Sequence, residues 1–172
     1  RQIAFDDFIA VAEDLISSKI TSPRHLGIMG GSNGGLLVAT VMVQRPELFN
    51  AVVSTVPLLD MARFAELLAG PSWIGEYGDS RVASDCEYLL TYSPYHNVKP
   101  GVNYPAPFFI TSTADDRVHP GHARKMAMRM KEQGHTFYFL ESRAGGHAAS
   151  TTPLAAAERN SLMYSYFWSR LR

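Results

Sequence analysis

The sequence lacks several features that mark specialised classes of protein. Its 172 residues contain one cysteine, Cys86, which excludes an internal disulfide and leaves the redox compartment open. Sixteen Lys and Arg residues balance sixteen Asp and Glu residues, and a chain without excess basic charge is a poor binder of nucleic acid. The longest apolar runs, such as residues 34–43, are too short to span a bilayer. We therefore expect neither nucleic acid nor membrane as a partner.

The composition is that of a folded domain. A hydrophobic content of 46% supports a packed core, and the length predicts one domain over residues 1–172. The first residue is Arg1, so we expect a piece of a longer protein or a processed one, with any targeting signal upstream. The expected compartment is the cytoplasm, with the periplasm as the alternative.

Short apolar segments alternate with segments of helical periodicity. This alternation predicts an α/β fold with a mostly parallel sheet flanked by helices. The predicted strands are residues 26–29, 51–56, 107–112 and 136–141. The predicted helices are residues 5–18, 36–44, 61–68, 86–92, 120–133 and 153–171, with loops over 69–80 and 142–152 and a connector over 95–106.

A G-x-S-x-G pattern lies between the first predicted strand and the second predicted helix. It runs from Gly30 through Ser32 to Gly34. A nucleophilic serine on a sharp strand-to-helix turn has strained backbone angles, and close packing around the turn leaves little room for side chains at the glycines. The helix start supplies N–H groups for an oxyanion, and the N–H of Asn33 is the expected donor. A simple turn is the alternative interpretation of these residues.

A serine nucleophile needs a base and an orienting acid, and in this arrangement they follow in the order Ser, acid, His. Asp115 and Asp116 follow the third predicted strand, and His147 follows the fourth among glycines, so all lie at one sheet edge. Spacing alone divides the acid role evenly between the two aspartates. The other histidines are interpreted as surface or packing residues: His25, His96, His119, His122 and His135.

With these features the sequence resembles the prolyl oligopeptidase family of serine peptidases, specifically its C-terminal α/β-hydrolase domain. The similarity extends over nearly the whole chain. Its landmarks are FDDF (5–8), GGSNGGLLV (30–38), QRPELF (44–49), YSPYHNV (92–98), DDRV (115–118) and GGH (145–147). So many landmarks in order are far more specific than any single motif.

The resemblance implies a role for individual residues. It implies Ser32 as nucleophile, His147 as general base and Asp115, the first of the two aspartates, as the acid. It also implies that the substrate-binding residues are Trp73, Tyr77, Arg117, Val118 and Leu58: two aromatic residues of a proline pocket, an arginine for a substrate carbonyl, and two apolar pocket positions. The implied function is hydrolysis of short peptides on the carboxyl side of proline, through an acyl-enzyme and without metal or cofactor.

The chain also departs from the family pattern. Ala148 and Pro57 stand where glycine is common in the family, and both departures argue against a strict requirement for proline in the substrate. Family members carry an N-terminal β-propeller and further strands of the sheet, together with a tyrosine that supplies a second oxyanion donor. None of these is in the chain, so we expect only the C-terminal half of the sheet. We also expect that the upstream region or self-association covers its edge.

Three alternatives remain at this stage. One is an esterase or acylaminoacyl-peptidase-like hydrolase with the same Ser32, Asp115 and His147, because fold does not fix substrate. The second is a fragment that is inactive alone. The third is a nucleotide-binding domain, which is disfavoured because residues 30–35 lack the lysine of a phosphate loop and the full dinucleotide spacing.

Overall fold

The fold is built on a parallel sheet. The structure is a computed structural model that describes residues 1–143, 145–148 and 152–172. Within these residues, four strands pair in the order β1-β2-β3-β4, and each pairing is parallel. The strands are β1 (Gly27–Gly31), β2 (Ala51–Thr55), β3 (Phe108–Ser112) and β4 (Tyr138–Ser142). The predicted parallel sheet flanked by helices is confirmed.

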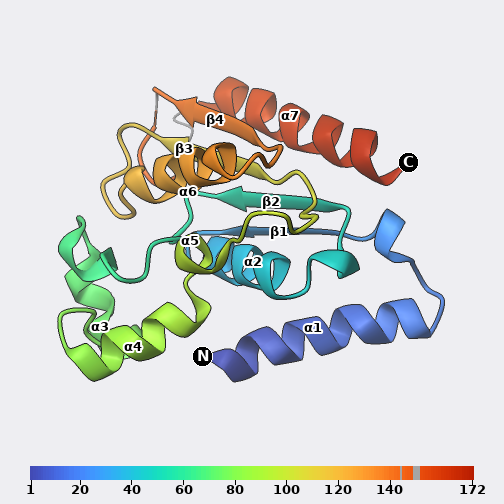
Figure 1. The fold of residues 1–172 in the computed structure, drawn as a ribbon. Helices are drawn as coiled ribbons and strands as arrows, with labels where there is room; N and C mark the ends of the chain where they lie inside the picture. Colours follow the sequence, from blue (N-terminus) through green and yellow to red (C-terminus); the bar gives the residue numbers. More distant parts are fainter. Residues whose placement is uncertain (144, 149–151) are drawn as a thin grey trace.

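Helices cover both faces of the sheet (Figure 1). On one face lie α2 (Asn33–Gln44) and α6 (Gly121–Glu132), with α1 (Gln2–Ser17) outside α2; on the other face lies α7 (Pro153–Leu171). The side chains of β2 alternate between these two layers, because successive residues of a strand point to opposite faces. Val52 belongs to the core cluster under α2, and Val53 belongs to the cluster under α7.

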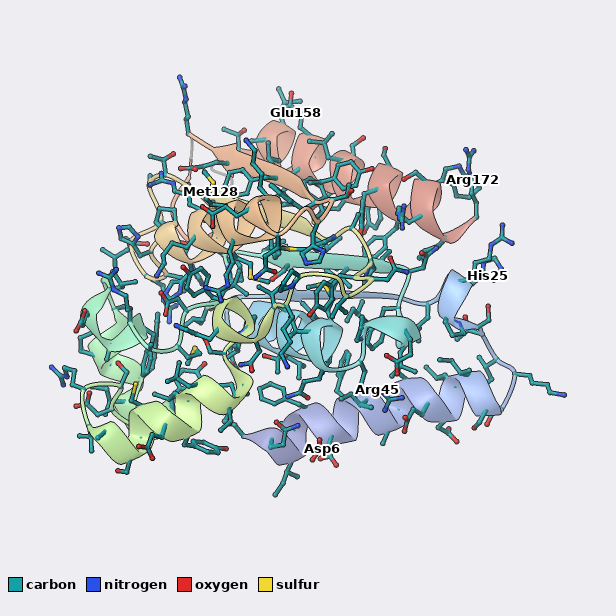
Figure 2. All side chains as sticks on the ribbon, in the orientation of Figure 1. Asp6, His25, Arg45, Met128, Glu158 and Arg172 are labelled. Carbon is teal, nitrogen blue, oxygen red and sulfur yellow. The ribbon has the colours of Figure 1, made fainter. Side chains whose placement is uncertain are left out.

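A buried tyrosine hydroxyl and an exposed ion pair join the two outer helices to the central layers. The Tyr166 hydroxyl of α7 donates to the Ala106 carbonyl at 2.7 Å and accepts from the Val52 N–H at 2.9 Å. On the opposite side, Arg45 at the end of α2 lies between α2 and α1 (Figure 2), where its guanidinium bonds Glu13 at 2.6 Å. These contacts hold α7 and α1 against the central layers.

Short helices fill the connection between β2 and β3, near the carboxyl end of the sheet (Figure 1). They are η3 (Phe64–Glu66), η4 (Gly70–Trp73), α3 (Ile74–Tyr77), α4 (Ala83–Tyr92) and α5 (Pro94–Asn97). Two further short turns, η1 (Pro23–His25) and η2 (Pro46–Leu48), precede β1 and β2. The long connection therefore brings the aromatic residues of segment 73–77 toward the strand ends.

Some predicted boundaries were wrong. The helix predicted over residues 61–68 is only the three-residue turn η3, because Leu68 has a φ of 48° and the next N–H, of Ala69, donates to the Arg117 carbonyl at 3.2 Å. The loop over 69–80 contains η4 and α3, and the connector over 95–106 begins inside α5. Part of the predicted loop 142–152 lies outside the described residues.

The outer strands β1 and β4 leave apolar side chains exposed. Met29 of β1 is 56% exposed and Tyr138 of β4 is 48% exposed. None of the helices in the described ranges has both the length and the apolar character needed to cross a membrane.

Candidate active site

Ser32 occupies the turn between β1 and α2 in a backbone conformation that L-residues rarely adopt. Its φ is 56° and its ψ is −117°. The Ser32 N–H donates to the Thr55 carbonyl at 2.8 Å, and the Ser32 carbonyl accepts from the Leu36 N–H at 3.2 Å. The end of β2 and the first turn of α2 thus hold the residue in a strained geometry, as in the strand–turn–helix context of a nucleophilic serine.

The two glycines of the G-x-S-x-G pattern differ in the space around them. A Cβ added at Gly30 would lie 2.1 Å from the Gly34 carbonyl oxygen, so no side chain fits there. At Gly34 an added Cβ meets nothing within 4 Å, so the expectation of close packing is wrong for that position. The crowding on the helix side falls instead on Gly35, where a Cβ would lie 2.7 Å from the Pro57 Cβ.

Asp115 and His147 are joined across the carboxyl ends of β3 and β4. The Nδ1 atom of His147 lies 2.9 Å from Oδ2 and 3.1 Å from Oδ1 of Asp115. The Asp115 side chain is fully buried, whereas that of His147 is 20% exposed. Because an ionised carboxylate only accepts hydrogen bonds, Nδ1 carries the proton and Nε2 keeps a lone pair that can accept one.

The loop after β3 fixes the carboxylate of Asp115. Its Oδ1 accepts the backbone N–H groups of Arg117 and Val118, each at 2.9 Å. Asp116, the alternative acid by spacing, is exposed. The structure therefore brings His147 to Asp115 and leaves Asp116 at the surface.

The histidine loop is anchored to β3 through Ser112, whose hydroxyl donates to the Gly145 carbonyl. A hydrogen bond between Ser32 and His147 is not made in the part of the chain that the structure describes. In enzymes without substrate such bonds are often long and tighten only when substrate binds. Asp115 and His147, the expected acid and base, are joined here, and Ser32 is presented at the same sheet edge.

Asn33 begins α2 directly after Ser32. As the first helical residue it carries one of the N–H groups that have no acceptor within the helix, which suits it to bind an oxyanion. Its side-chain Oδ1 accepts a hydrogen bond of 2.7 Å from the Tyr77 hydroxyl. This contact joins residues 44 positions apart, and no sequence signal pointed to it.

The residues assigned to substrate binding differ in their surroundings. Leu58 and Val118 are each 2% exposed, and Trp73 is half-buried against the main core cluster. Arg117 is exposed, so its guanidinium is accessible to a ligand. Tyr77 is 5% exposed, and its ring meets that of Phe64 edge-on with 5.4 Å between centroids. Tyr77 is thus packed in the domain rather than presented at its surface.

A buried polar cluster next to this edge was not predicted. We define it as Asp60, His96, His122 and Lys125. Asp60 is 1% exposed and is paired with the Lys125 ammonium, and its Oδ1 lies 3.8 Å from the His96 Nε2. The pairs link the segment after β2 to α5 and α6, and only long-range packing reveals them.

His122 is the buried histidine of this cluster and is 2% exposed. Its Nδ1 accepts the N–H groups of Asp60 at 3.0 Å and Leu59 at 3.3 Å, which requires a neutral ring. Burial lowers the pKa of His122 to about 4, despite the attraction of Asp60. Burial likewise lowers the pKa of His96. His122 was interpreted as a surface or packing histidine, and it is a packing one.

The described part of the chain contains no group of three or more His, Cys, Asp or Glu side chains arranged to hold a metal ion.

The parallel sheet, the strained serine turn and the Asp–His pair on the following loops define the α/β-hydrolase class. The model of the prolyl oligopeptidase family matches residues 1–172. The chain belongs to that family.

Individual relatives agree with this assignment. The chain is 55% identical over 171 residues to an uncharacterized peptidase, y4nA, of Sinorhizobium fredii, covering 99% of this chain and 24% of that protein. It is 38% identical over 168 residues to a prolyl endopeptidase of Elizabethkingia meningoseptica, covering 95% and 24%. The solved structure of a post-proline cleaving enzyme from Rickettsia typhi matches with a TM-score of 0.97 at 44% identity, covering 99% and 25%. The chain spans about a quarter of the length of these relatives.

Proposed function

We propose that the protein carrying this chain is a serine peptidase that hydrolyses short peptides, preferentially after proline. The observation that carries the proposal is the buried Asp115 carboxylate bonded to His147 at the sheet edge that presents the strained Ser32 turn. A hydroxyl is a weak nucleophile, and a histidine held by a carboxylate is the usual means of activating it.

The first half of the proposed reaction acylates the serine. The Nε2 atom of His147 takes the proton of the Ser32 hydroxyl while Oγ attacks the carbonyl carbon of the scissile peptide bond. Asp115 stabilises the imidazolium that forms, and the Asn33 N–H donates to the oxyanion of the tetrahedral intermediate. His147 then returns the proton to the leaving amine nitrogen, the C–N bond breaks, and the acyl group stays on Ser32 as an ester.

The second half releases the acyl group. Water attacks the ester carbonyl while His147 accepts its proton, and the oxyanion again lies at the Asn33 N–H. Collapse of this intermediate returns the proton to the Ser32 Oγ and frees the carboxylic acid. Every proton passes through His147, so the sequence of steps requires no cofactor.

Preference for proline is supported by the apolar residues near the site and by the names of the relatives. Trp73 offers an aromatic surface, which suits the flat, apolar ring of proline, and Leu58 and Val118 are apolar neighbours in the proposed pocket. The exposed guanidinium of Arg117 would donate to a backbone carbonyl of the substrate. The relatives from E. meningoseptica and R. typhi are named as a prolyl endopeptidase and a post-proline cleaving enzyme.

A second candidate is an esterase or acylaminoacyl-peptidase-like hydrolase with the same three residues. It is favoured by Pro57, a bulky ring buried against Gly35 beside the nucleophile turn. The ratio of kcat/KM for a Gly-Pro anilide to that for a short acyl ester distinguishes the two. A much higher kcat/KM for the ester than for the anilide would favour the esterase candidate over the peptidase.

The 172-residue chain alone is proposed to be weakly active or inactive. Its sheet ends at β1 with Met29 56% exposed, and we propose that the upstream region or a second copy covers this edge. A second oxyanion donor is expected from outside the chain, and one such donor is worth about 100- to 1000-fold in rate. Full activity of the isolated, monomeric chain on a proline peptide would contradict this proposal.

Labelling with a fluorophosphonate tests the proposed function. The full-length protein is incubated with the reagent and its intact mass is measured, with Ser32→Ala as the matched control. We expect one adduct, absent from the control, and loss of turnover in Ser32→Ala without loss of the fold. Wild-type turnover in Ser32→Ala would show that the nucleophile is another residue. The same labelling of the 172-residue chain reports whether Ser32 and His147 are assembled without the remainder.

A further inference from the structure

The hydroxyl of Tyr77 is directed at Asn33, the residue that follows the expected nucleophile. It donates a 2.7 Å hydrogen bond to Oδ1 of Asn33, the first residue of α2. Tyr77 ends the four-residue helix α3 and Asn33 follows Ser32, so this bond connects the long β2–β3 connection to the oxyanion side of the site.

The donor is held firmly. Tyr77 is 5% exposed, its ring packs edge-on against Phe64 at 5.4 Å, and the Arg1 guanidinium lies over the ring, 4.4 Å from its centroid. Burial raises the pKa of the Tyr77 phenol, so the hydroxyl keeps its proton at neutral pH and remains a donor. The rigid ring therefore offers a fixed point to an otherwise exposed asparagine.

The acceptor matters because of its position. Asn33 is exposed and belongs to the first turn of a helix that starts immediately after a residue of positive φ. Backbone hydrogen bonds of Ser32 hold the start of this helix, and the bond from Tyr77 adds a side-chain restraint at Asn33 itself. With Oδ1 occupied by Tyr77, the Asn33 side chain ties its own peptide N–H, the expected oxyanion donor, to the packed segment 74–77.

We propose that Tyr77 is a positioning residue for the oxyanion donor, acting through Asn33. This inference rests on the proposed function and gives the Tyr77 hydroxyl a role in addition to the pocket wall that the family resemblance implies for the ring. A pocket wall acts on the affinity for proline. A positioning residue acts on the transition state of every substrate, because oxyanion stabilisation is common to all acyl transfers.

Tyr77→Phe separates the two roles, because it removes the hydroxyl and keeps the ring. In the full-length protein we expect kcat to fall about ten-fold for both a proline anilide and a short acyl ester, with KM changed less than two-fold. The loss is smaller than the 100- to 1000-fold cost of deleting an oxyanion donor, since the N–H remains but is less well aimed. The matched control is Tyr164→Phe, an exposed tyrosine on α7, which should leave both rates unchanged.

A double-mutant cycle with Asn33→Ala tests the path of the effect. Once Asn33 has lost its amide, Tyr77→Phe should cause no further loss of kcat, because contacting residues in one network are not additive. Fully additive losses would overturn the inference, and so would a Tyr77→Phe effect confined to KM for the proline substrate. A purely structural role would lower the midpoint of unfolding without this pattern in kcat.

Labelling with fluorophosphonate distinguishes failure of the proposed function from failure of the Tyr77 inference. If the unaltered protein is not labelled by fluorophosphonate at Ser32, the proposed function fails and this inference fails with it. If Ser32 is labelled and Tyr77→Phe is labelled at the same rate as the unaltered protein, only the inference is overturned.

Discussion

The Nδ1 atom of His147 lies 2.9 Å from Oδ2 of Asp115, although 32 residues separate the two in the sequence. The carboxylate in this pair is fully buried and also accepts two backbone N–H groups from its own loop. A charge buried in this way is stabilised by its donors and fixes the orientation of the imidazole. The contribution of the pair can be tested by Asp115→Asn, which replaces one carboxylate oxygen with an NH2 group and keeps the size of the side chain.

Asp115→Asn is expected to reduce kcat of the full-length protein by about 10⁴-fold, the scale found when a triad aspartate is amidated. The amide would offer a donor where His147 needs an acceptor, and so would favour the wrong imidazole tautomer. Steady-state kinetics on a proline anilide measures the effect. Asp116→Asn is the matched control, since Asp116 is exposed, and a larger loss there than in Asp115→Asn would reverse the assignment of the acid.

Trp73→Ala is expected to raise KM for proline substrates, with smaller effects on unrelated esters. In the proposed function the aromatic surface binds the proline ring in both ground and transition states, so its loss would weaken binding without disabling the chemistry. Parallel measurements with a Gly-Pro anilide and a short acyl ester give the comparison. Equal losses on both substrates would indicate general disruption of the half-buried core contacts of Trp73.

The stability of the domain is expected to decrease as the pH falls from about 6.5 to about 4. The pKa of His122 is lowered to about 4 in the folded state by burial, so between these values the unfolded chain binds a proton that the folded chain does not. A shift of this size corresponds to a loss on the order of 3 kcal/mol across the window. Denaturant unfolding of the full-length protein at several pH values measures it.

His122→Asn provides the control for this pH dependence. The asparagine oxygen can take the place of Nδ1 as acceptor for the Asp60 and Leu59 N–H groups, but it does not titrate in this range. Its stability should vary less between pH 4 and 6.5 than that of the unaltered protein. His25→Asn alters an exposed histidine and should leave the slope as it was. An unchanged slope in His122→Asn would assign the pH effect to other groups.

The sequence was most informative where a pattern is local. Alternating apolar segments predicted the parallel sheet, and the serine motif together with strand ends predicted which loops carry Asp115 and His147. The start of α2 was predicted three residues late, because Asn33 and the glycines that follow have poor helix propensity, which tertiary contacts override. The sequence thus predicts which loops carry the site residues but not the exact ends of the helices beside them.

Contacts between distant segments could not be predicted. The hydrogen bond from Tyr77 to Asn33 and the pairing of Asp60 with Lys125 join parts of the chain that no periodicity relates. The predicted helix over residues 61–68 failed for the same reason. Its apolar spacing serves burial of Met61 and Phe64, while the backbone turns at Leu68 to meet the loop after β3.

The positive φ of Ser32 implies that the domain gives up stability to hold a serine at this turn. A strained non-glycine residue costs roughly 1–3 kcal/mol, whereas glycine tolerates the same angles at an entropic cost of about 0.5–1 kcal/mol. Ser32→Gly should therefore unfold at higher denaturant concentration than the unaltered protein while losing all turnover.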